Sequence, residues 1–166
     1  MIASESMDLA AQAHLYELRG AEEIVHNPIA AVRTFRLVHR LPRKMRDERR
    51  AVAAVMAMAM AYSRVGREQS TVRLLELALR QSPDWYAPAT ELAMQRELEA
   101  DRALAKGDLV TALRKYRSAA IMHRRALSIL ESGADSRGRP SCVADERARL
   151  ACCEAEAAKI EGPSSR

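Results

Sequence analysis

"GREQSTVRLLELALRQSP", residues 66–83, indicates a repeat, because two other segments of the chain align with it without gaps. These segments are "HNPIAAVRTFRLVHRLP" from His26 and "GDLVTALRKYRSAAIMHR" from Gly107, at offsets of 40 and then 41 residues. The matched positions have similar chemistry: Val32 with Val72 and Leu113, Arg33 with Arg73 and Arg114, Phe35 with Leu75 and Tyr116, and Val38 with Ala78 and Ala119. A repeat of this length indicates stacked copies of one supersecondary unit.

Each segment is predicted to form one amphipathic helix, since its large apolar positions fall three apart and share a face. Asn27 followed by Pro28 is typical of a helix start, while Gly66 and Gly107 are typical of the turn that closes a preceding helix. We therefore expect another helix before each segment. The expected helices cover about 5–25, 49–65 and 88–106, and the "SRGRP" stretch at 136–140 precedes a last one at 142–160.

The composition favours helices over sheets. Aromatic residues make up 4% of the 166 residues, and only six glycines and six prolines interrupt the chain. We predict one all-α domain, an α-α superhelix of three helical hairpins in residues 1–135, with units at about 5–43, 48–83 and 88–131. Residues 136–160 are predicted to cap this stack within the same domain, and residues 161–166 to form a disordered tail.

The segment from Leu9 to Leu130 resembles the tetratricopeptide repeat family, which has a Gly-Asp-type turn followed by small, large apolar and alanine positions and a closing proline. The second unit supplies Ala61, Tyr62, Gly66, Leu75, Ala78 and Pro83, with Thr71 where the family prefers alanine; the third supplies Gly107, Asp108, Ala112, Tyr116 and Ala119. The repeat is longer than the family's usual length of about 34 residues. The chain looks like a divergent, long-helix relative.

Stacked hairpins leave the first helix of each unit lining an inner surface, and such surfaces bind other chains. In "AVAAVMAMAMAY", residues 51–62, the stripe of Ala54, Met58 and Ala61 is predicted to be core. The resemblance to tetratricopeptide repeats implies that a separate stripe with Met56 and Met60 faces the groove. Methionine side chains adapt to varied apolar partners. The expected groove residues are Met56, Met60, Ser63, Arg64, Met94, Glu97 and Asp101. Alternatively, the methionines fill gaps against neighbouring units or a homodimer partner.

The charge is distributed unevenly along the chain. The segment from Arg33 to Arg50 has eight Lys/Arg and two Asp/Glu, a net +6, whereas the first 24 residues have a net −4. The predicted basic strip consists of Arg33, Arg36, Arg40, Arg43 and Lys44. It can attract an acidic peptide, an amphipathic helix with acidic residues or a phosphate backbone, or it can neutralise the first helix or simply solvate an exposed edge.

A helix-turn-helix DNA-binding regulator is the alternative function. The segment Gly66–Glu76 resembles such a motif, with Gly66 at the turn and "QSTVRLLE" as a recognition helix. Its base-contacting candidates are Gln69, Ser70, Thr71 and Arg73. Nucleic acid is nevertheless the less favoured partner. The forty-residue repeat explains three segments of the chain, whereas the helix-turn-helix motif explains one.

No catalytic motif is evident, so we expect a protein that is not an enzyme and has no cofactor. Cys142, Cys152 and Cys153 lack the paired spacings of a zinc site and are expected to be small apolar helix residues, with no metal. The apolar run at residues 51–62 is too short to span a bilayer, and the N-terminus has no secretory pattern. We expect a cytoplasmic adaptor, chaperone or regulator that binds a protein or peptide, with no membrane contact.

Overall fold

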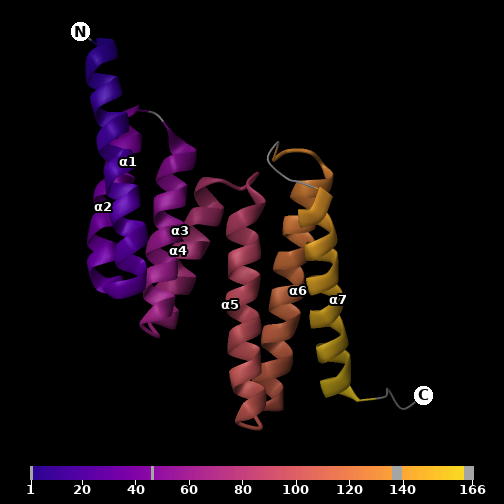
Figure 1. The fold of residues 1–166 in the computed structure, drawn as a ribbon. Coiled ribbons are helices and arrows are strands. Elements are labelled where there is room, and N and C mark those ends of the chain that lie inside the picture. Colours follow the sequence, from indigo (N-terminus) through magenta and orange to yellow (C-terminus); the bar gives the residue numbers. More distant parts are fainter. Residues whose placement is uncertain (1, 46, 136–139, 163–166) are drawn as a thin grey trace. The chain divides into compact units, whose positions relative to one another are not determined.

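The computed structural model describes residues 2–45, 47–135 and 140–162, with side chains from Asp8 onward apart from residues 42–46 and Pro140. These ranges contain helices and no strand, so the predicted all-α class is confirmed (Figure 1). The helices are α1 Ile2–His26, α2 Pro28–Met45, α3 Glu48–Arg64, α4 Glu68–Gln81, α5 Tyr86–Ala105, α6 Leu109–Glu131 and α7 Pro140–Glu161.

The chain divides into two compact units, Met1–Ser82 and Pro83–Arg166. In the first unit α1 packs on α2, α2 on α3 and α3 on α4, while α1 also contacts α3. In the second unit α6 packs between α5 and α7, so α7 covers the third hairpin as the predicted capping helix would. The boundary falls between the second and third predicted hairpins.

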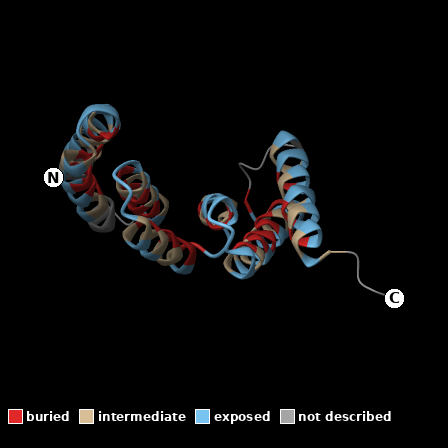
Figure 2. Ribbon diagram, turned by 90° about the horizontal axis from the view of Figure 1, so that it is seen from below, coloured by how far each residue is buried: buried red, intermediate tan, exposed pale blue. Residues whose placement is uncertain are grey.

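The period of the repeat is visible in the helix boundaries. The second helices of the three hairpins, α2, α4 and α6, begin at Pro28, Glu68 and Leu109, 40 and 41 residues apart. At the equivalent positions Phe35, Leu75 and Tyr116, each side chain is at most 5% exposed. Figure 2 shows the buried residues on the sides of the helices that meet within each unit. The aligned sequence positions therefore have the same structural role.

The turns before α4 and α6 are also equivalent. Gly66 and Gly107 have φ values of 71° and 75°, a left-handed conformation that glycine adopts without a Cβ clash. In each turn the following residue donates its backbone N–H to a carbonyl five residues back, Arg67 to Tyr62 and Asp108 to Ala103, both at 2.9 Å. These bonds satisfy carbonyls that a helix end leaves unpaired.

Within the described part of the chain, side chains cap α2, α3 and α6. Asn27 Oδ1 accepts a hydrogen bond from the Ala30 N–H at 3.2 Å, next to the proline that begins α2. Asp47 and Asp108 cap α3 and α6 in the same way, each accepting at 3.0 Å from the N–H three residues on. The predicted N-cap at residue 27 is therefore confirmed.

Alanine lets the helices of the second unit approach closely. One core cluster joins Ala100 and Ala103 of α5 with Ala112 and Tyr116 of α6 and Ala157 of α7. A second cluster contains Ala119, Ala120 and Cys153. Small side chains at these contacts bring the helix backbones close together. A larger polar side chain between the same helices therefore contacts side chains of the neighbouring helices.

None of the helices within the described ranges combines the length and the apolar character needed to cross a membrane. The apolar run at residues 51–62 belongs to α3, and most of its side chains are buried in the first unit. The last helix includes Glu161, the first residue of the expected tail, while residues 163–166 lie outside the described part of the chain.

Candidate functional site

The two stripes predicted on α3 differ in burial as expected. Ala54, Met58 and Ala61 are buried in the core. Met60 is 47% exposed and Arg64 is also exposed, whereas Met56 and Ser63 are half-buried. This division leaves an apolar and basic surface on α3, and its role in binding remains a prediction.

An ion pair fixes α3 beside α1, the first helix of the preceding hairpin. Arg50 Nε and Nη2 donate to the two carboxylate oxygens of Glu17 at 2.6 and 2.7 Å. Such a two-point contact sets orientation as well as distance. Arg50, Met60 and Arg64 lie on the same side of α3. The exposed stripe with Met60 and Arg64 therefore runs along α3 from Arg50, where α3 contacts α1.

The predicted groove residues on α5 have different surroundings, within the second unit. Met94 is 37% exposed. Asp101 is exposed and accepts a hydrogen bond from the Tyr116 hydroxyl at 2.5 Å; burial, and then this hydrogen bond, raise the pKa of Tyr116. The Glu97 carboxylate contacts α6 and α7 instead of a free surface. Met94 and Asp101 therefore have the exposed side chains that the groove prediction requires, whereas Glu97 is half-buried.

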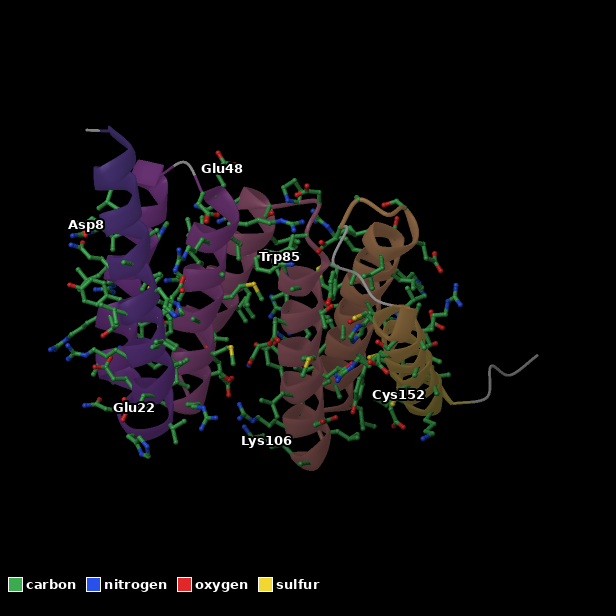
Figure 3. The ribbon with its side chains drawn as sticks, turned by 45° about the horizontal axis from the view of Figure 1, so that its top comes forward. Asp8, Glu22, Glu48, Trp85, Lys106 and Cys152 are labelled. Carbon is green, nitrogen blue, oxygen red and sulfur yellow. The ribbon has the colours of Figure 1, made fainter. Side chains whose placement is uncertain are left out.

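The described part of the basic strip is solvent-facing. Arg33, Arg36 and Arg40 are exposed on α2, while the side chains of Arg43 and Lys44 lie outside the described residues. The acidic first helix is neutralised in part, because Arg50 pairs with Glu17. Other acidic residues of α1, among them Asp8 and Glu22, are exposed (Figure 3). Arg50 lies outside the basic strip, so the three expected roles of the strip itself, anion binding, neutralisation of the first helix and solvation of an exposed edge, stay predictions.

The proposed recognition helix, α4, exposes only part of its predicted DNA-contacting set. Gln69 and Arg73 are exposed and Ser70 is half-buried. Thr71 is 2% exposed, and its hydroxyl donates to backbone carbonyls at Ala59 and Arg67. A base contact by Thr71 would require these internal hydrogen bonds to break.

A buried polar cluster in the second unit was not predicted. His123 on α6 is fully buried between two carboxylates. Its Nδ1 lies 2.6 Å from Glu146 Oε2 of α7, and its Nε2 lies 2.7 Å from Glu97 Oε1 of α5. The Cys153 thiol donates to the same Glu97 oxygen at 3.0 Å, and Thr90 Oγ1 donates to Glu146 Oε1 at 2.6 Å. Three helices thus contribute to one site.

The hydrogen bonds define the protonation of this cluster. Burial lowers the pKa of His123, but hydrogen bonds with Cys153, Glu146 and Glu97 outweigh it and raise the pKa to about 11. Burial raises the pKa of Glu97, but its bonds with His123 and Cys153 reverse this and lower it. Burial also raises the pKa of the Cys153 thiol. Near neutral pH the site therefore holds an imidazolium, ionised Glu97 and a protonated thiol.

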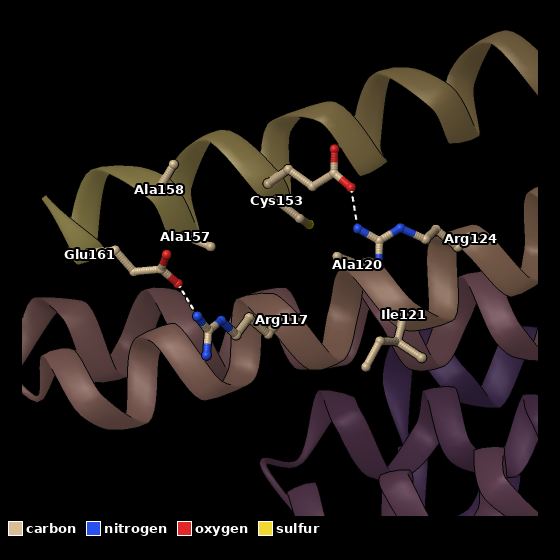
Figure 4. A pocket seen from close by; sticks show the side chains of 9 residues that line it. Arg117, Ala120, Ile121, Arg124, Cys153, Ala157, Ala158 and Glu161 are labelled. Carbon is tan, nitrogen blue, oxygen red and sulfur yellow. Dashed lines mark hydrogen bonds and ion pairs between the residues drawn. The ribbon is translucent and has the colours of Figure 1, made fainter. Parts of the chain in front are cut away.

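A groove between α6 and α7 leads to this cluster. Its volume is about 420 Å³, and its lining includes Ala120, Cys153 and Ala157. Figure 4 shows two ion pairs across it, Arg117 with Glu161 and Arg124 with Glu154, on either side of Cys153. Both pairs join exposed side chains, which can separate at little cost.

The sequence contained a signal for the cluster that spacing rules alone do not detect. On α6, His123 interrupts the buried stripe that includes Ala119 and Ala126. On α7, Glu146 begins a stripe that continues through Cys153 and Ala157. A polar side chain within an apolar stripe needs a buried partner. That rule identifies His123 and Glu146 as candidates but does not identify which helices supply their partners.

No protein-family model matches the chain, and no curated protein matches it. Among solved structures, one similar chain is BtubC (BKLC) from P. vanneervenii, with 18% sequence identity over 92% of this chain and 84% of that one. Its TM-score is 0.29, a value too low to indicate a shared fold.

Proposed function

We propose that the chain is a non-catalytic, cytoplasmic helical-repeat protein, an adaptor, chaperone or regulator that binds a protein or peptide. The observation that carries this proposal is the exposed stripe of α3. Met60 and Arg64 are exposed on a helix most of whose apolar side chains are buried, and Arg50 on the same face pairs with Glu17 of α1. An apolar side chain beside a cation suits an amphipathic segment with acidic residues.

The tetratricopeptide-like pattern supports the same proposal. The three hairpins share the spacing of their second helices and a buried position on them, and the second and third also share the geometry of their turns. Repeats of this kind present their first helices to a partner. Met94 on α5 occupies the first helix of the third hairpin, as Met60 does in the second. An unbranched methionine at both positions favours a partner bound through adaptable apolar contacts.

The basic strip gives the proposed partner its charge. Arg33, Arg36 and Arg40 follow one edge of α2 at intervals of three and four residues and are exposed. Exposed cations steer the encounter with an acidic partner more than they strengthen the final complex. Reversing the charge at Arg36 and Arg40 is therefore expected to slow association and to reduce its salt dependence, with a smaller effect on dissociation.

Affinity capture from the native host, divided into nuclease-treated and untreated halves, tests the proposal. A stoichiometric protein that is retained after nuclease treatment is expected. Recovery of nucleic acid, with no stoichiometric protein left after digestion and a steep salt dependence, would instead support the helix-turn-helix function. Binding kinetics of the captured partner with the Arg36 and Arg40 variants then test the steering role.

A further inference from the structure

The buried cluster has the donor atoms of a transition-metal site. Glu97, His123 and Cys153 each offer one ligand atom, and these atoms all lie within 4.8 Å of one another. Carboxylate oxygen, imidazole nitrogen and thiolate sulfur are all zinc ligands, at bond lengths of about 2.0–2.3 Å. Ligand atoms around such an ion lie about 3.3–3.8 Å apart, so the present separations need only small side-chain movements.

The second layer of contacts is also in place. His123 Nδ1 lies 2.6 Å from Glu146, and Thr90 holds the other oxygen of that carboxylate. A metal-binding histidine usually donates its remaining N–H to such a carboxylate, which fixes the ring and its tautomer. With Nδ1–H directed at Glu146, loss of the Nε2 proton leaves the Nε2 lone pair facing Glu97.

From these contacts we propose that Glu97, His123 and Cys153 bind one Zn²⁺-class ion, with Glu146 as the positioning residue for His123. Binding replaces the proton between His123 and Glu97 and the Cys153 thiol proton, and both protons leave to solvent. A doubly charged ion thus replaces two protons, so the formal charge of the buried cluster does not change. This exchange avoids the large cost of adding net charge to a protein interior.

The groove between α6 and α7 gives the metal ion a path to the cluster and admits the water molecule that serves as its fourth ligand. Cys153 lies on its floor, and the flanking ion pairs of Arg117 and Arg124 join exposed side chains. A water molecule that enters by this route can complete a tetrahedral site. The bound ion would cross-link α5, α6 and α7, and it would stabilise the folded unit because the unfolded chain has no preformed site.

Cobalt(II) titration of the full-length, reduced and metal-stripped protein tests the proposal. A thiolate-to-cobalt charge-transfer band that saturates at one ion per chain, and that zinc displaces, is expected. The adjacent Cys152 is exposed, so Cys152→Ala is the matched control and should keep both the band and the affinity. In Cys153→Ala the band should be lost, and zinc should no longer raise the melting temperature.

A second variant covers the case in which Cys153→Ala does not fold. Glu97→Gln keeps the side-chain shape and can still accept a hydrogen bond from His123, but an amide is a poor zinc ligand, so affinity should fall at least tenfold. Glu146→Gln should weaken binding about 10–100-fold by disturbing the ring of His123. The proposal is overturned if the folded wild type shows no band, if Cys152→Ala abolishes it, or if Glu97→Gln binds as tightly as wild type.

Discussion

Glu146 lies 2.6 Å from His123 Nδ1 although both side chains are buried. Removing Glu146 is costly because the buried imidazolium keeps Glu97 as a partner but loses this contact without gaining access to water. We predict that Glu146→Ala lowers the free energy of unfolding by about 3–5 kcal/mol, measured by urea denaturation with a chelator present. The matched control is Glu154→Ala, which breaks an exposed pair with Arg124 and should cost less than about 1 kcal/mol. Equal losses in the two variants would contradict the account.

Gly20 allows close contact between α1 and α2. A Cβ at this position would lie 2.7 Å from Phe35 Cζ. Alanine has the higher helix propensity by about 1 kcal/mol, but the overpacking is expected to dominate, so Gly20→Ala should destabilise the protein by about 1–3 kcal/mol. In a Phe35→Leu background the same substitution should cost less, as thermal unfolding of the four proteins would reveal. A Gly20→Ala protein more stable than wild type would refute this explanation.

The pair of Arg50 with Glu17 links the two first helices of the first unit. Both side chains are partly exposed, so a double-mutant cycle with Arg50→Ala and Glu17→Ala should give a coupling energy of about 0.5–1 kcal/mol. Arg50→Lys should recover less than half of it, because lysine cannot make the two-point contact. A coupling energy of zero would show that the pair does not hold α1 against α3.

The Glu99 carboxylate gives the second unit an acid-dependent contribution to stability. Burial raises the pKa of Glu99, but the hydrogen bonds from Lys115 and Arg96 outweigh it and hold the pKa below its ordinary value of 4.5. The contribution is therefore present above pH 4.5 and is lost as the pH falls through the lower folded-state pKa. Urea denaturation from pH 7 to pH 2 should show a stability difference between wild type and Glu99→Gln that shrinks only below pH 4.5.

The Lys115→Met variant is the control for this titration. Without Lys115 the folded-state pKa of Glu99 should lie closer to 4.5, so the substitution of Glu99 should cost less and the acid dependence should be weaker. If the cost of Glu99→Gln has the same pH dependence in both backgrounds, the ion pair is not its cause.

The repeat made much of the fold predictable. A helix buries residues at a fixed period, so Phe35, Leu75 and Tyr116 could be assigned to the core from their alignment alone. The turns at Gly66 and Gly107 were predictable because a left-handed residue that closes a helix is usually glycine. The all-α class followed from the composition, which favours helices over sheets.

The candidate site was less predictable because its members are far apart in the sequence. Glu97 and Cys153 are 56 residues apart and meet only because α6 packs against both α5 and α7. The pattern of α5 placed Glu97 and Asp101 on one face, but it did not show which helices that face would meet. Glu97 was therefore assigned to a groove, whereas its carboxylate contacts His123 and Cys153.

The most direct test of the protein-binding proposal compares two variants in the nuclease-treated and untreated halves of the same capture. Met60→Asp changes the exposed stripe of α3, and Arg73→Glu changes the proposed recognition helix, α4; both positions are exposed, so both variants should fold. If the stripe of α3 binds the partner, Met60→Asp should reduce recovery of the stoichiometric partner at least tenfold, while Arg73→Glu should leave it unchanged. Full recovery with Met60→Asp, together with loss of bound nucleic acid in Arg73→Glu, would contradict the proposal.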